Sequence, residues 1–261
     1  MITNFLDLDV FSAKEIEDLL HLSMAVKNGT NSSNSLSGKF LGLIFEKPST
    51  RTRVSFEVAM TQLGGKASFL SVNDLQLGRG EPIQDTSKVI SSMVDGLVLR
   101  TMKHETQIEF SNHSSVPVIN GLSNKSHPCQ LLADLLTFYE EKGSIEGKKV
   151  TWFGDFNNVC FSYAQASELF GFEFWVACPA EYIPASAKTF KNLHFTQSIT
   201  EAAEESDLIS TDVWVSMGDE KDAKKRLRYF SDYQVNADIL NLARPDVIFL
   251  HCLPAVRGNE I

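Results

Sequence analysis

The residues with the clearest chemical character lie in one short run, Ser49-Thr50-Arg51-Thr52-Arg53. The run follows an apolar stretch at residues 40–45 and opens a helical pattern. The first backbone N–H groups of a helix have no internal partner, and the helix dipole makes that end positive. Hydroxyl groups and a guanidinium group, which can grip phosphate with two hydrogen bonds, add to this. A capped helix with surface arginines has the same pattern, but the position after a strand favours a phosphate site.

The run is a different kind of phosphate site from the two best-known ones. The sequence contains neither a G-x-x-x-x-G-K-[ST] loop nor a G-x-G-x-x-G fingerprint. A second candidate, Arg100, closes the apolar stretch at residues 96–100. An arginine in that position is often only a surface residue whose stem packs on apolar neighbours. Beside an anion site at the same sheet edge, a role in binding the ligand is favoured.

His127 and Gln130 flank the start of a long helical pattern at residues 128–140, which Pro128 opens. Residues three apart on a helix share a face, so both side chains can point at one position above the helix start. The imidazole offers a donor that can be charged, and the amide offers both a donor and an acceptor. Together they suit a carbonyl oxygen and an NH2 group.

The second half of the chain has three further candidates. Residues 154–158, Gly-Asp-Phe-Asn-Asn, are typical of a turn with an asparagine cap. Asp212 opens a loop that ends at Gly218; its carboxylate can hold a substrate ammonium, and the loop can act as a lid. Cys252 is a possible nucleophile, but no partner stands at usable spacing, and a buried structural cysteine is the commoner case.

The elements that must position these residues alternate along the chain. Strands are predicted at residues 40–45, 67–71, 96–100, 116–119, 149–153, 172–177, 208–211 and 247–251. Helices are predicted after a capping box at Ser12 and Glu15, and at residues 50–63, 82–93, 104–112, 128–140, 159–170 and 200–205. Alternation indicates parallel sheets covered on both faces, with ligands beyond the carboxyl ends of the strands. We therefore expect an α/β protein with two Rossmann-like domains, at residues 1–142 and 143–261, each a mainly parallel sheet flanked by helices.

Composition limits the class of protein. The 261 residues include 24 basic and 33 acidic side chains, a net charge of −9, which argues against a nucleic-acid partner. The four cysteines show neither C-x-x-C pairs nor zinc-site spacing, as expected for a reducing cytoplasm. The first residues lack the pattern of a signal peptide, and no apolar run reaches the length of a membrane span. We expect a cytoplasmic protein that binds neither nucleic acid nor membrane.

Taken in order, these motifs resemble the aspartate/ornithine carbamoyltransferase family across nearly the whole chain. Residues 49–53 resemble the family's carbamoyl-phosphate loop, and residues 127–130 resemble its second signature. Residues 212–218, with His-Cys-Leu-Pro-Ala at 251–255, are similar to the ornithine branch. The resemblance implies transfer of a carbamoyl group from carbamoyl phosphate to the δ-amine of L-ornithine, giving L-citrulline and phosphate in arginine metabolism. It also implies a homotrimer with sites at subunit interfaces, and neither a metal nor an organic cofactor.

The resemblance assigns a role to each matching residue. Carbamoyl phosphate would be bound by Ser49, Thr50, Arg51, Thr52, Gln76, Arg100, His127, Gln130, Cys252 and Leu253, with Gln76 reaching a neighbouring subunit's site. Ornithine would be bound by Asn158, Asp212, Ser216 and Met217. Within this set, Arg100, His127 and Thr52 would stabilise the developing oxyanion. Cys252 would lie where the two substrates meet.

Two alternatives remain open at this stage. Family members continue after the last motif with an Asp-Glu-Ala-Glu-Asn-Arg-type segment and a helix, and we expect no counterpart of that arginine before Ile261. One alternative is thus a catalytically impaired, truncated homologue that binds carbamoyl phosphate or a partner subunit. The other is a sister carbamoyltransferase with a different amine acceptor.

Overall fold

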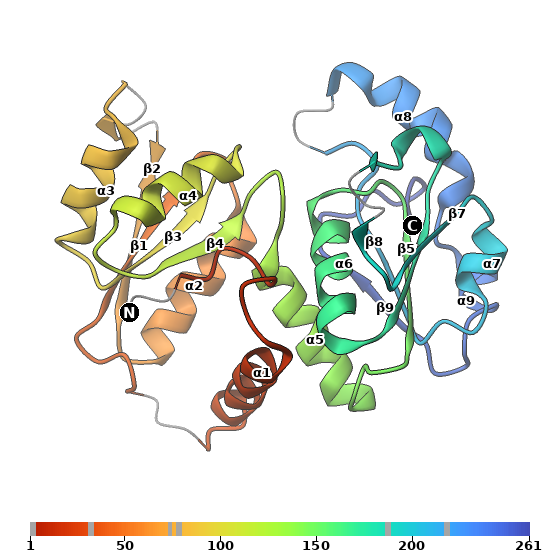
Figure 1. The fold of residues 1–261 in the computed structure, drawn as a ribbon, viewed down its shortest axis with the longest axis horizontal. Helices are drawn as coiled ribbons and strands as arrows, with labels where there is room; N and C mark the ends of the chain where they lie inside the picture. Colours follow the sequence, from red (N-terminus) through yellow and green to blue (C-terminus); the bar gives the residue numbers. More distant parts are fainter. Residues whose placement is uncertain (1–3, 31–33, 73–74, 77–79, 186–188, 217–219) are drawn as a thin grey trace. The chain divides into compact units, whose positions relative to one another are not determined.

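The computed structural model describes residues 4–30, 34–72, 75–76, 80–185, 189–216 and 220–261. The chain forms two compact units, Met1–Leu132 and Ala133–Ile261, each with its own sheet and helices (Figure 1). Both sheets are parallel, so the predicted α/β class with two mainly parallel sheets is confirmed. The compact units divide earlier in the chain than the boundary predicted after residue 142, which stays a prediction.

The first unit is built on a four-stranded sheet in the order β2-β1-β3-β4. Its strands are β1 Phe40–Phe45, β2 Lys66–Ser71, β3 Gly96–Arg100 and β4 Val118–Leu122. Its helices are α1 Ala13–Lys27, α2 Thr50–Gln62, α3 Ile83–Ser91, α4 His104–His113 and the start of α5 Pro128–Lys142. The predicted capping box is present, since Ser12 and Glu15 bond each other's backbone N–H groups at the start of α1.

The second unit has a five-stranded sheet in the order β7-β6-β5-β8-β9. Its strands are β5 Lys149–Phe153, β6 Glu173–Ala177, β7 Leu193–Thr196, β8 Leu208–Thr211 and β9 Ile248–His251. Its α-helices besides the rest of α5 are α6 Asn158–Phe170, α7 Ile199–Ala203, α8 Ala223–Phe230 and α9 Ala237–Leu240. Helix α6 ends at Gly171, whose φ of +67° is a conformation that glycine adopts without strain.

Burial on both faces explains why the first sheet could be read from apolar runs. Successive side chains of a strand point to opposite faces, and two separate apolar clusters lie there. One contains Leu43 and Val98, and the other contains Ile44 and Leu99. All five residues of β3 are buried. Because helices cover both faces, the strands read as continuous apolar runs rather than alternating ones.

One strand lies later in the sequence than expected. Strand β4 was predicted at residues 116–119 but runs from Val118 to Leu122. It starts after Pro117, which has no N–H group to donate to a ladder. Its end includes Asn120 and Gly121, both buried despite their low strand propensity. This polar end of β4 lies next to the candidate site.

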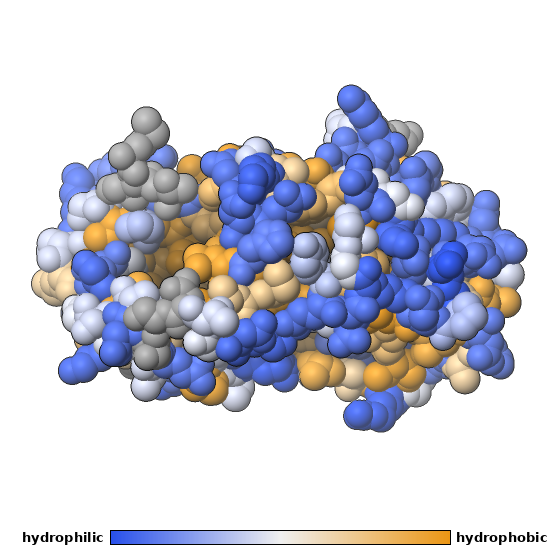
Figure 2. All heavy atoms as spheres, turned by 90° about the horizontal axis from the view of Figure 1, so that it is seen from below, coloured by the Kyte–Doolittle hydropathy of each residue, from blue (hydrophilic) through white to orange (hydrophobic). Residues whose placement is uncertain are grey.

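The surface is mixed in character. Figure 2 shows orange, hydrophobic side chains gathering between blue, hydrophilic ones on the face seen there. Among the exposed hydrophobic residues are Val54 and Val58 of α2, 49% and 45% exposed. Within the described part of the chain, no helix has both the length and the apolar character of a membrane span.

Candidate active site

The start of α2 and the end of β3 form the first part of the site. Ser49 caps α2, its hydroxyl oxygen accepting from the backbone N–H of Thr52 at 3.3 Å. Arg100, only 8% exposed, donates from Nη1 to the Thr52 hydroxyl oxygen at 3.4 Å. A guanidinium group therefore lies at the positive end of a helix. A positively charged side chain at the positive end of a helix attracts an anion.

Glu46, which no sequence motif singled out, joins the two segments that carry these groups. Its backbone N–H donates to the Arg100 carbonyl oxygen at 2.8 Å. Its carboxylate accepts from the backbone N–H of Met102 at 2.5 Å. The loop after β1 is thus joined to Arg100 itself and to the backbone two residues after it. The pairing of β1 with β3 brings Glu46 to Arg100 and Met102, so no local sequence pattern predicts this contact.

Arg53 lies in the same motif but takes another role. Its Nε donates to Glu57 at 3.0 Å, and its guanidinium lies 4.1 Å from the centre of the Phe69 ring. It lines a pocket of about 570 Å³ beside α2 that also includes Ser49 and Thr50. Neither Arg100 nor His127 lines that pocket. Arg51, by contrast, is exposed at the first turn of α2, where it can reach an anion.

His127 is held by a tight turn between β4 and α5. The Ser123 N–H donates to the Ser126 carbonyl oxygen at 3.0 Å, which closes the turn. Asn120 is fully buried, and its amide donates to the Ser126 hydroxyl oxygen at 3.1 Å and to the Leu6 carbonyl oxygen at 2.9 Å. The residue just before His127 is therefore anchored to β4 and to the N-terminal segment. Gln130 is half-buried in the first turn of α5.

His127 is a neutral imidazole rather than the cation that its residue type also allows. Burial, together with the Arg100 charge, lowers the pKa of His127 to about 3. At neutral pH it can donate one hydrogen bond, without a positive charge of its own. Of these two side chains, only Arg100 carries a positive charge.

The low pKa of His127 predicts that acid destabilises the first unit. The unfolded chain binds a proton to this histidine near pH 6.5, but the folded chain does so only near pH 3. Between these values the unfolded state binds more protons, so stability should fall as pH falls. The slope should approach roughly 1.4 kcal/mol per pH unit. Urea unfolding between pH 4 and 7 measures this; a His127→Gln variant with an unchanged slope would contradict it.

In the second unit, Asp212 follows β8 and Asn157 follows β5. Asn157 caps α6, its side-chain oxygen accepting from the N–H groups of Val159 and Cys160 at 3.0 Å. Its amide nitrogen donates to Asp212 Oδ2 at 2.8 Å, so one asparagine fixes both the helix start and the carboxylate. Burial raises the pKa of Asp212. Asn158 begins α6 and Ser216 lies in the Asp212 loop, both half-buried; Met217 lies outside the described residues.

Cys252 lies beside Asp212 and is a protonated thiol. Burial and the charge of Asp212 raise the pKa of Cys252 far above its usual range, and the two side chains hydrogen-bond. A thiolate nucleophile is therefore disfavoured. The atoms of Asp212, His251 and Cys252 that could coordinate a metal ion lie within 4.8 Å of one another. Both ring nitrogens of His251 are already engaged, with the Leu253 N–H at 2.9 Å and Glu260 Oε1 at 3.2 Å.

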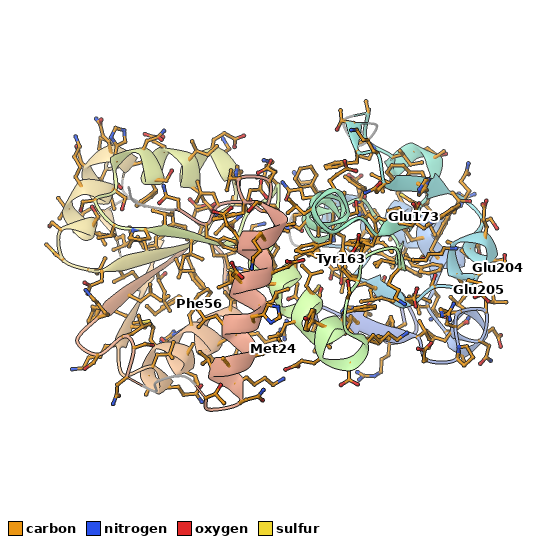
Figure 3. All side chains as sticks on the ribbon, turned by 60° about the horizontal axis from the view of Figure 1, so that its bottom comes forward. Met24, Phe56, Tyr163, Glu173, Glu204 and Glu205 are labelled. Carbon is orange, nitrogen blue, oxygen red and sulfur yellow. The ribbon has the colours of Figure 1, made fainter. Side chains whose placement is uncertain are left out.

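Two further side chains support the second unit, and neither was found from the sequence. Arg226 of α8 forms an ion pair with Asp155 and donates from Nε to the Trp214 carbonyl oxygen at 2.5 Å. It thus joins the loop after β5 to the loop after β8. Tyr163, labelled on α6 in Figure 3, is 1% exposed and donates to Asp134 Oδ2 at 2.8 Å.

Comparison with known proteins defines the class. Residues 3–140 match the carbamoyl-P binding domain, and residues 146–261 match the Asp/Orn binding domain, of aspartate/ornithine carbamoyltransferase. The chain belongs to the aspartate/ornithine carbamoyltransferase family.

Its relatives narrow the comparison to one branch. The ornithine carbamoyltransferase of Hydrogenovibrio crunogenus is 50% identical and covers 100% of this chain and 88% of its own length. The anabolic ornithine carbamoyltransferase of Pseudomonas aeruginosa is 49% identical, covering 100% and 87%. The solved structure of the anabolic enzyme from Campylobacter jejuni superposes with a TM-score of 0.93 at 42% identity, covering 99% of this chain and 88% of that chain.

Proposed function

We propose that this protein transfers the carbamoyl group of carbamoyl phosphate to the δ-amine of L-ornithine, giving L-citrulline and phosphate in arginine biosynthesis. The observation that carries the proposal is the placement of Arg100 on Thr52 at the capped start of α2. That arrangement suits an acyl phosphate whose carbonyl oxygen gains negative charge. The names of the relatives support ornithine as the acceptor.

In the proposed reaction the δ-amine nitrogen bonds to the carbonyl carbon, and the bond from that carbon to the phosphate oxygen breaks. Arg100, the Thr52 hydroxyl and neutral His127 donate to the oxygen that becomes negative. Ser49, Thr50 and Arg51 hold the departing phosphate at the helix start. The amine loses its proton as it attacks, and phosphate is the base at hand to receive it. Gln130, Cys252 and Leu253 complete the binding of the carbamoyl group.

The ornithine end is assigned to the second unit. The carboxylate of Asp212 pairs with the α-ammonium group, and Asn157 keeps that carboxylate oriented. Asn158, Ser216 and Met217 contact the rest of the amino acid. The protonated thiol of Cys252 acts as a hydrogen-bonding contact and not as a nucleophile. This division assigns the phosphate and the carbonyl oxygen of carbamoyl phosphate to residues 1–142 and ornithine to residues 143–261, where Cys252 and Leu253 also contact the carbamoyl group.

The assembly and location are proposed on the same grounds. We propose a cytoplasmic homotrimer in which Gln76 reaches a neighbouring subunit's site. Gln76 is exposed, and α2 presents the exposed side chains of Val54 and Val58, which suits a covered surface. Mixing inactive Gln76→Ala subunits with inactive Arg100→Met subunits should restore part of the activity, and no recovery at any ratio would contradict a shared site.

Arg51 provides a direct test of the phosphate site. The change Arg51→Ala should weaken binding by the roughly 1.5–3 kcal/mol of a charge-assisted hydrogen bond, or about 10- to 150-fold. Calorimetric titration with inorganic phosphate measures the affinity. Arg53→Ala is the matched control because Arg53 is engaged by Glu57 and Phe69. Equal affinities in the wild type and in Arg51→Ala would show that Arg51 does not bind phosphate at the start of α2.

The identity of the amine acceptor is tested by measuring which carbamoylated product forms fastest. Purified protein with carbamoyl phosphate should form citrulline from ornithine faster than it carbamoylates shorter or longer diamino acids or aspartate. A higher rate with another amine would point to a sister transferase. Phosphate binding without any turnover would point to a non-catalytic relative.

A further inference from the structure

The last residue of β3 lies at an irregularity in the sheet. Leu99 pairs with Asn120, but the next residue, Arg100, pairs with Leu122, so Gly121 is left over. A Cβ atom on Gly121 would lie 2.9 Å from the Val98 side chain and 3.2 Å from the Leu99 carbonyl oxygen. Only glycine fits there. A bulge of this kind changes the direction of a neighbouring side chain, and the neighbour here is Arg100.

A single buried side chain from α4 contacts both strands at this bulge. Gln107 is fully buried, and its Nε2 lies 3.3 Å from the Leu99 carbonyl oxygen and 3.0 Å from the Thr101 hydroxyl oxygen. These are the residues on either side of Arg100. The same nitrogen lies 2.9 Å from the Leu122 carbonyl oxygen, opposite Arg100 on β4. Gln107 therefore holds Arg100 from both its neighbours and from its partner strand.

The orientation of the amide follows from its partners. Two of the three are carbonyl oxygens, which can only accept. The third, the Thr101 hydroxyl, donates its own hydrogen to the Lys103 carbonyl oxygen at 2.7 Å, so it too accepts from Gln107. The NH2 group must therefore face the bulge, and the amide oxygen must face away from it.

The oxygen of the same amide is less well satisfied than its nitrogen. The Gln107 oxygen is buried and meets no hydrogen-bond donor among the residues described, which is unfavourable. The sheet does not depend on the amide at Leu122, whose carbonyl oxygen already accepts from the Thr101 N–H at 3.0 Å. An apolar side chain of similar length would fill the space without an unsatisfied oxygen. A buried side chain with one unsatisfied atom is a departure from full hydrogen bonding of the kind expected at functional sites.

We propose that Gln107 is a positioning residue for Arg100: its amide fixes the bulge that aims the guanidinium group at the start of α2. The inference rests on the proposed function of Arg100 in binding carbamoyl phosphate. Gln107 touches no substrate, and it acts only through the backbone on either side of Arg100 and across from it.

The change Gln107→Met removes the amide and keeps the volume. It should weaken binding of inorganic phosphate about 10-fold, raise the KM for carbamoyl phosphate and lower kcat, and leave the KM for ornithine unchanged. The variant loses the three contacts of the amide nitrogen as well as the unsatisfied oxygen, so the melting temperature is measured in parallel and binding is compared where both proteins are folded. Gln165→Met is the matched control: Gln165 is also a buried helical glutamine, 3% exposed, in the second unit. It should bind phosphate like the wild type.

A double-mutant cycle tests whether the effect passes through Arg100. In an Arg100→Ala background, Gln107→Met should cause no further loss of phosphate affinity. An equal loss in both backgrounds would overturn the proposal, whatever the melting temperature does. Unchanged phosphate affinity in Gln107→Met would overturn it alone and leave the proposed function standing. A wild-type protein that binds no phosphate would instead overturn the proposed function, and this inference with it.

Discussion

Replacing Arg100 by methionine is expected to lower the rate of citrulline formation by roughly 100- to 1000-fold. The guanidinium group is 8% exposed and already bonded to Thr52, so it is oriented before substrate arrives. Stabilisation by a preoriented donor is stronger away from water, because solvent neither screens the charge nor has to reorganise. Since His127 is neutral, it cannot supply this charge in place of Arg100.

Steady-state kinetics with saturating ornithine measures the loss, and methionine keeps most of the packing of the arginine stem. The same variant offers a readout that does not depend on activity. The Arg100 charge contributes to the low pKa of His127, so that pKa should rise in Arg100→Met, as followed by nitrogen NMR of the imidazole. A variant with wild-type turnover would show that Arg100 is only a structural residue of the sheet edge.

The predicted core of the site came from one physical rule. Buried parallel strands are continuous apolar runs, so the ends of β1 and β3 could be found to the residue, and with them Ser49 and Arg100. Ligands in such sheets lie beyond the carboxyl ends of strands. The polar residues that follow those ends were therefore candidates before any contact was known.

The elements missed by the sequence analysis lack that signal. Strand β7 is four residues long, half-buried, and paired on one side only, at the edge of its sheet. Helix α8 reads Ala-Lys-Lys-Arg-Leu-Arg-Tyr-Phe, only eight residues of which four are basic, so its few apolar residues do not stand out as a periodic stripe in the sequence. Yet α8 carries Arg226, which joins two loops of the proposed ornithine site. Its charged partner, Asp155, is far away in sequence, so only the folded chain reveals the pair.

The supporting contacts could not be predicted for the same reason. Glu46, Gln107 and Asn120 act by hydrogen-bonding backbone groups of other segments. Nearly every residue offers the same backbone groups, so the sequence does not indicate which residue accepts or donates such a hydrogen bond. The protonation state of His127 is likewise set by tertiary burial. Residue types and spacing thus indicated the candidate ligand-binding groups, while the groups that hold them in place could be identified only from the fold.

The change Asp212→Asn is expected to lower kcat/KM for ornithine by roughly 30- to 5000-fold, the effect of removing one partner of a buried charge pair. The carboxylate accepts from the Asn157 amide at 2.8 Å and from the Val213 N–H at 2.8 Å, so it is already oriented for the proposed contact with the ammonium group of ornithine. Asparagine keeps the shape but not the charge. Phosphate affinity should stay near the wild-type value because Asp212 belongs to the second unit.

The pH dependence separates this role from a structural one. Burial raises the pKa of Asp212, so the carboxylate should become neutral at a higher pH than an exposed aspartate does. Ornithine binding should therefore weaken as pH falls through that pKa, and this acid limb should vanish in Asp212→Asn, which carries no charge at any pH. The δ-amine imposes its own limb at higher pH in both proteins, which serves as an internal reference. If Asp212→Asn kept the acid limb, or lost phosphate and ornithine binding together, the carboxylate would not be the group that recognises ornithine.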